Sequence, residues 1–174
     1  LGYQFVSSYV AEENMDMLVL LEDILTENLA YVRDSDGGML RKIGPNWING
    51  IGDWTSTEGY LFKVFGPETF SFEGDLVPSD TPISLPIGFR FISYLPTSPM
   101  NAMTAFETII GDDLAYIRDS NGNMLRKIGP VWVNGIGDAN PGEGYLVKML
   151  NPGTLIYPGG SSSPVIENFE GDPP

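Results

Sequence analysis

The chain has 174 residues and a net charge of −14, from 23 acidic side chains against 9 Lys and Arg. A surface this acidic repels a phosphate backbone, which argues against nucleic acid as a partner. The sequence contains no cysteine and no histidine, so it excludes disulfides and thiolate metal sites and lacks the side chain that most often serves as a general base.

One long segment occurs twice and organises the rest of the chain. Residues 29–64 and 114–149 align without a gap, and 25 of the 36 positions are identical. Self-similarity of this kind indicates tandem modules. The organisation we expect is a first module at 1–75, a connecting segment at 76–87, a second module at 88–160 and, at 161–174, a linker or the start of a further module.

Each module is expected to begin with a strand and continue into a short helix. At 2–9 and 88–95, aromatic and β-branched residues alternate with polar ones, which is typical of a strand. Asp16 and Asn101 are suited to cap the first turn of a helix. Spacings of three and four place the apolar residues that follow on one helical face: Leu18, Leu21, Ile24 and Leu25, matched by Met103, Phe106, Ile109 and Ile110. Helices of about ten residues are unstable alone, so each should pack on a sheet.

The duplicated segment predicts hairpins. In the first copy a strand at 30–34 reaches an Asp-Gly turn, and residues 39–43 form the return strand. A second tight hairpin is expected over 47–51, on Asn-Gly, followed by strands at 60–65 and 69–72. The second copy repeats these elements, with Asn-Gly at the first turn.

The connecting segment contains one further expected strand, at 83–85, which we predict to bridge the modules. The two cores would then pack against each other across this connection. The alternative is two modules joined by a loose linker that move independently. The fold class that follows is α+β: two similar tandem modules, mostly antiparallel sheet, with one short helix per module and a pseudo-two-fold relation.

The order of motifs resembles a known kind of repeat. A Gly-aromatic strand ending in Ser, an Asp/Asn-Gly hairpin, Ile-Gly-Asp and then Glu-Gly-Tyr with a following Lys are similar to tandem repeats of large secreted or cell-surface proteins of Bacteroidetes and related bacteria. Tyr3 and Phe89 stand where that repeat usually has Trp. The resemblance implies an extracellular, non-enzymatic setting with neighbouring modules of the same longer chain as partners. We expect no cofactor.

Two groups of acids are candidate sites. Asp34, Asp36, Asp119 and Asn121 have spacing that suits Ca²⁺, but no twelve-residue loop with a closing Glu follows, so we expect turns rather than a metal site. Asp53 and Glu58 form a carboxylate pair that recurs in the second copy, and paired carboxylates hydrolyse glycosides. Two identical active sites in small repeats would be unusual, so a glycoside-active enzyme is only a remote alternative and we expect no catalytic residues.

Trp54 lies where the copies disagree, because its counterpart is Ala139. Divergence between identical flanks indicates a loop that the core does not constrain. An exposed indole beside Asp53 and Glu58 would suit a carbohydrate-binding module, with a polysaccharide as partner. In the other interpretation, which we favour, Trp54 fills a gap beside the other module.

The leading hypothesis for function is a non-enzymatic structural or adhesive module of a secreted surface protein. Carbohydrate binding through loop aromatics is the alternative. No stretch reaches the ~18 apolar residues of a membrane span, so we expect no membrane insertion.

Overall fold

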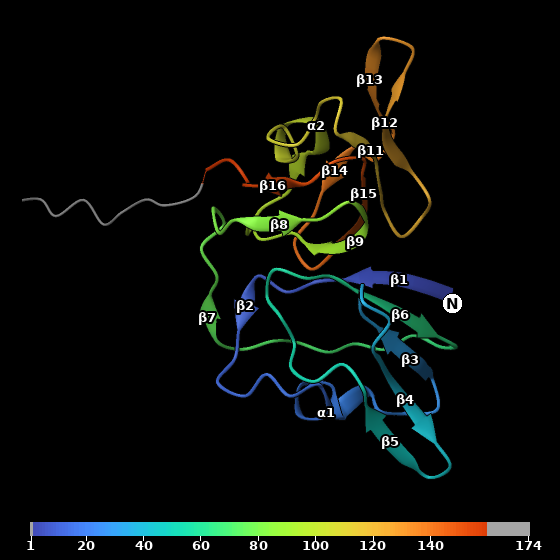
Figure 1. Ribbon diagram of the computed structural model, residues 1–174. Coiled ribbons are helices and arrows are strands. Elements are labelled where there is room, and N and C mark those ends of the chain that lie inside the picture. Colours follow the sequence, from blue (N-terminus) through green and yellow to red (C-terminus); the bar gives the residue numbers. More distant parts are fainter. Residues whose placement is uncertain (1, 160–174) are drawn as a thin grey trace, which may run out of the picture.

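The computed structural model describes residues 2–159, which form two similar β-sheet modules placed one above the other (Figure 1). The first module comprises β1 (Gly2–Val6), β2 (Val10–Ala11), α1 (Met17–Leu20), the 3-10 helix η1 (Glu22–Ile24), β3 (Leu29–Arg33), β4 (Met39–Ile43), β5 (Asn46–Asn49), β6 (Tyr60–Val64) and β7 (Asp75–Leu76). The second comprises β8 (Ile83–Leu85), β9 (Gly88–Ser93), β10 (Met100–Asn101), α2 (Ala102–Ala105), β11 (Leu114–Arg118), β12 (Met124–Ile128), β13 (Val131–Asn134), β14 (Asp138–Ala139), β15 (Gly144–Met149) and β16 (Gly153–Leu155).

Each module is built on one five-stranded antiparallel sheet. The strand order is β1-β6-β3-β4-β5 in the first module, and the corresponding strands follow the same order, β9-β15-β11-β12-β13, in the second. Two-stranded pairs, β2 with β7, β10 with β14 and β8 with β16, complete the modules. The expected α+β class, with two similar modules and one short helix in each, is confirmed.

The second hairpin of each sheet turns at a different place from the one expected. Ile43 pairs with Asn46, so β4 and β5 are joined by the two-residue loop Gly44-Pro45. Gly44 has φ +60, and a glycine with positive φ at the first loop position is typical of a type II′ turn. The hairpin expected over 47–51 is therefore wrong. Asn49 instead ends β5, and its Oδ1 accepts a hydrogen bond from N of Gly52 at 2.9 Å.

The helices are shorter than expected but are capped as predicted. N of Leu18 donates to Oδ1 of Asp16 at 2.8 Å, and N of Met103 donates to Oδ1 of Asn101 at 3.0 Å. In the first module the chain leaves the α-helix after one turn and enters η1, whose tighter winding changes which residues face inward. The predicted face is correct for Leu21, Ile24, Phe106 and Ile109, whereas Leu18, Leu25, Met103 and Ile110 are only half-buried and Met17, Leu20, Ala102 and Ala105 are buried instead.

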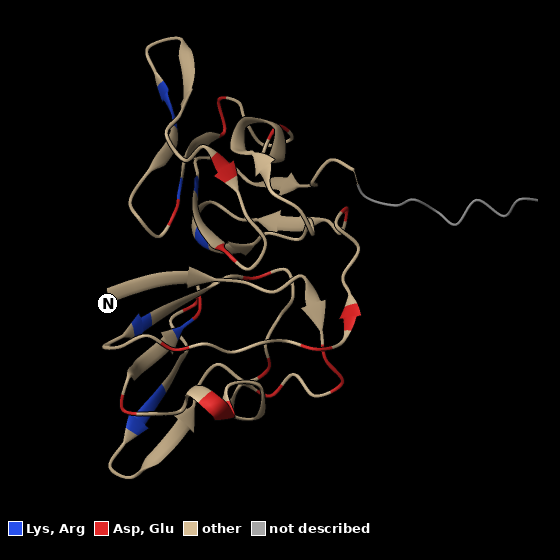
Figure 2. Ribbon diagram, turned by 180° about the vertical axis from the view of Figure 1, so that it is seen from behind, with Lys and Arg blue, Asp and Glu red and all other residues tan. Residues whose placement is uncertain are grey.

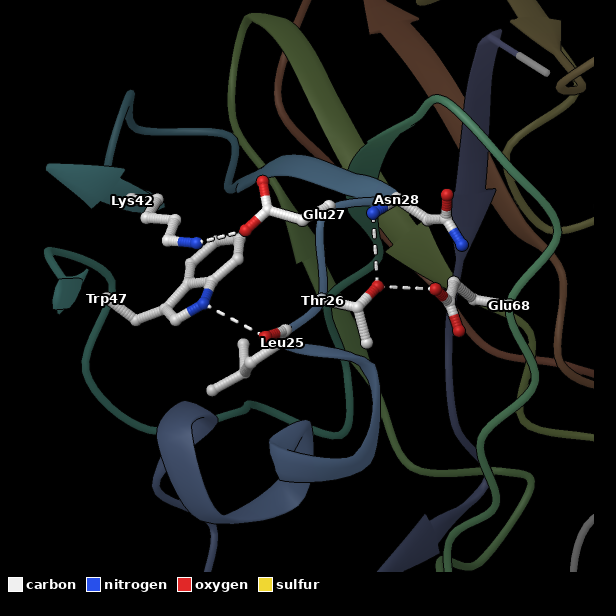
Figure 3. Close-up of polar contacts among 7 residues, drawn as sticks. All are labelled: Leu25, Thr26, Glu27, Asn28, Lys42, Trp47 and Glu68. Carbon is white, nitrogen blue, oxygen red and sulfur yellow. Dashed lines mark hydrogen bonds and ion pairs between the residues drawn. The ribbon is translucent and has the colours of Figure 1, made fainter. Parts of the chain in front are cut away.

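Hydrogen bonds attach the β4–β5 hairpin of the first module to the loop that follows η1 (Figure 3). The indole Nε1 of Trp47 donates to O of Leu25 at 3.1 Å, and Nζ of Lys42 forms an ion pair with Glu27. Lys127 and Asp112 form the same ion pair in the second module, at 2.9 Å. Exposed ion pairs of this kind contribute at most about 1 kcal/mol each to stability. The helix and the loop that follows it are therefore held in place mainly by packed side chains.

The modules have separate hydrophobic cores, and β8 belongs to the second. Ile83 and Leu85 are 4% and 0% exposed within that core, and among the described strands β8 pairs only with β16. The expectation that residues 83–85 bridge the two modules is therefore wrong. The strand expected at 69–72 is also wrong, because these residues belong to no strand. Of their counterparts at 154–157, only Thr154 and Leu155 lie in a strand, β16. The modules do touch, but through β1 and β9.

Candidate functional site at the module junction

The modules meet along the edge strands β1 and β9, which face each other in Figure 1. Phe5 and Phe91 occupy corresponding positions of these strands, and their ring centroids lie 5.3 Å apart. N of Phe5 donates to Oγ of Ser120 at 2.7 Å, and N of Phe91 donates to Oγ of Ser35 at 2.8 Å. Ser35 and Ser120 are also counterparts, so the junction is reciprocal, as at the interface of a two-fold dimer.

A second reciprocal pair of hydrogen bonds joins the same strands to the loops before β6 and β15. N of Ser7 donates to O of Gly142 at 3.0 Å, and N of Ser93 donates to O of Thr57 at 3.3 Å. These bonds and the two serine contacts use backbone groups that the free edge of a sheet would otherwise expose. Each module therefore covers the edge strand of the other.

Two glycines allow the backbones to approach this closely. A Cβ on Gly59 would lie 2.5 Å from O of Ile92, and a Cβ on Gly144 would lie 3.0 Å from O of Val6. The first distance is too short for an added carbon beside a backbone oxygen, and the second is tight enough that the backbone of Val6 would have to shift by a few tenths of an ångström. The Glu-Gly-Tyr motif shared by the two copies thus serves the contact between modules.

Charge breaks the symmetry of the junction. Arg90 Nη1 lies 2.9 Å from Oδ1 of Asp36, but the corresponding positions on the other side hold Gln4 and Asn121. All nine Lys and Arg of the chain lie in strands of the two large sheets, whereas most acids of the described residues lie in loops (Figure 2). Arg90 therefore carries a positive charge into an acidic boundary between the modules.

Glu58 is a half-buried acid at this boundary. Burial raises the pKa of its carboxyl group above the ordinary value, and the negative charges of Asp36 and Asp34 raise it further. The guanidinium of Arg90 opposes these effects. One side of the junction therefore carries an acid that takes up a proton more readily than an exposed glutamate.

The predicted sugar-binding residues do not form one surface. Glu58 faces the junction, but the backbone of Asp53 forms an isolated bridge with Asp16, the N-cap of α1. Trp54, which lies between them in the sequence, points into the core. The carboxylate pair Asp53 and Glu58 is thus divided between two parts of the first module.

The expectation that Trp54 is partly exposed is wrong. It is 2% exposed, and its ring centroid lies 4.3 Å from that of Tyr60 and 4.8 Å from that of Phe72. It fills the core of its own module rather than a gap beside the other one. The loop is held against this core because the hydroxyl of Tyr60 accepts a hydrogen bond from N of Thr55 at 2.8 Å. Burial raises the pKa of Tyr60 to about 12.

The calcium candidates act as turn residues. Oδ1 of Asp34 accepts a hydrogen bond from N of Asp36 at 2.9 Å. Oδ1 of Asp119 accepts from N of Asn121 at 2.9 Å and from N of Asn123 at 2.8 Å. Such bonds are typical of Asx turns. Within residues 2–159, no group of three or more acidic side chains is placed to hold a metal ion.

No protein-family model, curated protein or solved structure matches the chain. None of the helices within residues 2–159 combines the length and the apolar character needed to cross a bilayer.

Sequence reasoning missed the junction serines and phenylalanines. Phe5 and Ser120 lie 115 positions apart, and neither residue carries a local signal for the other. Their only mark in the sequence is that Phe5 matches Phe91 and Ser35 matches Ser120, which tandem inheritance explains equally well.

Proposed function

We propose that the two modules form a rigid structural unit that spaces and presents neighbouring domains of a longer secreted or cell-surface protein. The observation that supports this function is the reciprocal junction. Modules joined by a linker alone move independently, whereas here each edge strand is bonded to the other module at two places. Such a unit transmits a fixed orientation between the domains on either side.

The extracellular location is part of the same proposal. The repeated motifs resemble those of secreted and cell-surface repeat proteins, whose modules adjoin others in the same chain. A negative surface and a chain free of cysteine are compatible with that setting. In an adhesive version of this role, the outer faces of the sheets would meet a partner.

Rotational diffusion tests the rigid unit. We expect ¹⁵N relaxation to give one rotational correlation time for both modules. The double variant Ser35→Ala/Ser120→Ala removes the two side-chain acceptors at the junction and should loosen it, while Ser71→Ala, at an exposed position, serves as the control. Two different correlation times in the unaltered chain would contradict the proposal.

A second candidate, carbohydrate binding, is favoured by exposed aromatics on the sheets rather than in a loop. Tyr3 and its counterpart Phe89 are 51% and 54% exposed. Nζ of Lys63 lies 4.1 Å from the ring centroid of Tyr3, and Nζ of Lys148 lies 5.1 Å from that of Phe89. Each lysine covers one face of its ring, which leaves less aromatic surface for a sugar.

A glycan array distinguishes these two functions. For a pure spacer we expect no reproducible binding to any polysaccharide. Binding that is lost in Tyr3→Ala/Phe89→Ala, with an unchanged melting temperature, would replace the spacer function by carbohydrate recognition.

A further inference from the structure

The second module has a strand that lies along its sheet and closes its core. β8 pairs with β16 in the register Leu85 with Gly153, Ser84 with Thr154 and Ile83 with Leu155. Ile83 and Leu85 point inward and are buried, while Ser84 between them is exposed. The chain then passes through Pro86 and Ile87 into β9.

The first module has the receiving segment but no such strand. Residues 68–70 are the counterparts of β16, and within residues 2–159 no strand pairs with them. From Thr69 to Phe72, exposed and half-buried side chains alternate, and the counterparts at 154–157 alternate in the same phase. The same inward and outward pattern is therefore present in both modules.

Four of the core positions that are buried in the second module and half-buried in the first lie around this segment. Val6, Val64, Phe70 and Phe72 are half-buried, whereas their counterparts Ile92, Met149, Leu155 and Tyr157 are 0%, 3%, 0% and 1% exposed. In the second module Ile83 and Leu85 belong to the same core cluster as these four counterparts. Within residues 2–159, no strand gives the first module this cover.

The uncovered space is a groove between β1 and residues 68–72. One cavity of 390 Å³ is lined by Val6, Phe70 and Phe72, together with Pro141 and Gly142 of the second module. A second cavity of 300 Å³ is lined by Val6, Val64 and Phe70, so Val6 and Phe70 line both. Two apolar pockets along one extended segment match a strand that carries two inward side chains at alternate positions.

The receiving segment is held in place at its start. Oγ1 of Thr26 donates to Oε1 of Glu68 at 2.5 Å, as Figure 3 shows, and N of Phe65 donates to O of Asn28 at 2.7 Å. Beyond the segment, β7 is paired with β2. The segment is thus fixed at both ends, which limits the ordering needed before a strand adds to it.

We propose that this groove of the first module binds an extended peptide of the Pro-Ile-x-Leu type, the linker strand of another repeat module. Its backbone pairs antiparallel with residues 68–70, and its two apolar side chains enter the two cavities. Strand addition of this kind takes affinity from backbone hydrogen bonds and specificity from alternate side-chain pockets. The groove lies beside the junction, because Pro141 and Gly142 of the second module also line its first cavity. The proposal therefore rests on the rigid unit, which the relaxation experiment tests separately.

A graft on the full chain tests the proposal. The hexapeptide Thr-Pro-Ile-Ser-Leu-Pro, the sequence of residues 81–86, is added before Leu1. It is then joined to β1 in the same way as residues 81–86 are joined to β9. We expect the amides of residues 68–70 to become at least about tenfold better protected from hydrogen exchange, because the tethered strand acts at high effective concentration. The amides of β16 give the internal reference.

A matched graft in which Ser replaces both the Ile and the Leu should give no added protection. Equal protection from the two grafts, or none from either, would overturn the proposal. Titration with the free hexapeptide should shift resonances of Val6, Val64 and Phe70 and leave those of β16 unchanged. If the amides of 68–70 in the unaltered chain gain protection as its concentration rises, a second copy fills the groove instead and the peptide assignment is wrong.

Discussion

The two modules fill the same place in their cores from different positions in the sequence. In the first, Trp54 packs against Tyr60 and Phe72. In the second, the position of Trp54 holds Ala139, and Tyr94 packs against the counterpart rings Tyr145 and Tyr157 instead, with centroids 6.3 Å and 5.3 Å away. The first module has the small residue Ser8 where the second has Tyr94.

This exchange shows that divergence between aligned positions does not indicate a lack of constraint. Trp54 with Ser8, and Ala139 with Tyr94, are two ways of supplying one large aromatic group to a closely packed core. A comparison one position at a time finds only that Trp54 and Ala139 differ. The compensating residue lies on another element.

Among the variants that test this comparison, Trp54→Ala should cause the largest loss of stability. It removes an indole that is 2% exposed, and we expect a loss of about 3–5 kcal/mol in the free energy of unfolding. Chemical denaturation measures the loss. Trp54→Ala combined with Ser8→Tyr should recover part of it by using the arrangement of the second module. A loss below about 1 kcal/mol for Trp54→Ala alone would contradict core packing.

Leu21 and Phe106 allow the helices of the two modules to be compared directly. Both are 0% exposed at corresponding positions. Leu21→Ala should cost about 2–5 kcal/mol and Phe106→Ala about 3–5 kcal/mol, because the larger ring leaves the larger cavity. Phe106 also contacts the rings of Tyr145 and Tyr157. Thermal unfolding of the two variants checks the order, and equal losses would show that the second core collapses around the gap.

Gly59→Ala and Gly144→Ala compare the two sides of the junction. The added Cβ would meet a backbone oxygen at 2.5 Å in the first case and at 3.0 Å in the second, so we expect losses of about 1–3 kcal/mol, larger for Gly59→Ala. In the same variants, the two modules should also unfold in separate transitions. Gly111→Ala is the control, because its Cβ would have no neighbour within 4 Å. A larger loss for Gly144→Ala would contradict the reciprocal geometry.

Glu58→Gln tests the charged side of the junction at different pH values. We expect a smaller change in stability than from the glycine variants. Burial raises the pKa of Glu58 above the ordinary value of 4.5, so the folded state binds its proton more readily than the unfolded state. The ionised carboxylate therefore lowers stability at neutral pH, and this cost is removed as the pH falls through the raised pKa towards 4.5. The melting temperature of Glu58→Gln should exceed that of the unaltered chain at pH 7, with a difference that shrinks on acidification. A difference independent of pH would contradict this.

Chelation should have the smallest effect of all. Asp34 and Asp119 already accept backbone hydrogen bonds in both turns, so EDTA should leave the melting temperature nearly unchanged. A large fall that Ca²⁺ reverses would show that Asp34, Asp36, Asp119 and Asn121 bind metal. Scanning calorimetry with and without EDTA measures the outcome for both copies at once.

Local features of the chain were predictable because they depend on neighbouring residues. Asp16 and Asn101 cap helices through amides two positions ahead, and the turns at 34–38 and 119–123 use side chains that bond within four residues. The duplication itself predicted two similar sheets. The Gly44 turn was missed because both Gly-Pro and Asn-Gly suit a turn, and only the pairing of β4 with β5 decides between them.

The sequence by itself determined that the chain forms two β-rich modules with matched hairpins and capped short helices, because periodicity, turn residues and caps act over a few positions. Only the tertiary structure decided that Trp54 is buried, that β8 closes the second core, and that Phe5 meets Phe91 across the junction. These outcomes depend on which distant surfaces remain to be covered once the local elements have formed. The alignment of the two copies does not show which surfaces meet, because tandem inheritance explains the matches Phe5 with Phe91 and Ser35 with Ser120 equally well.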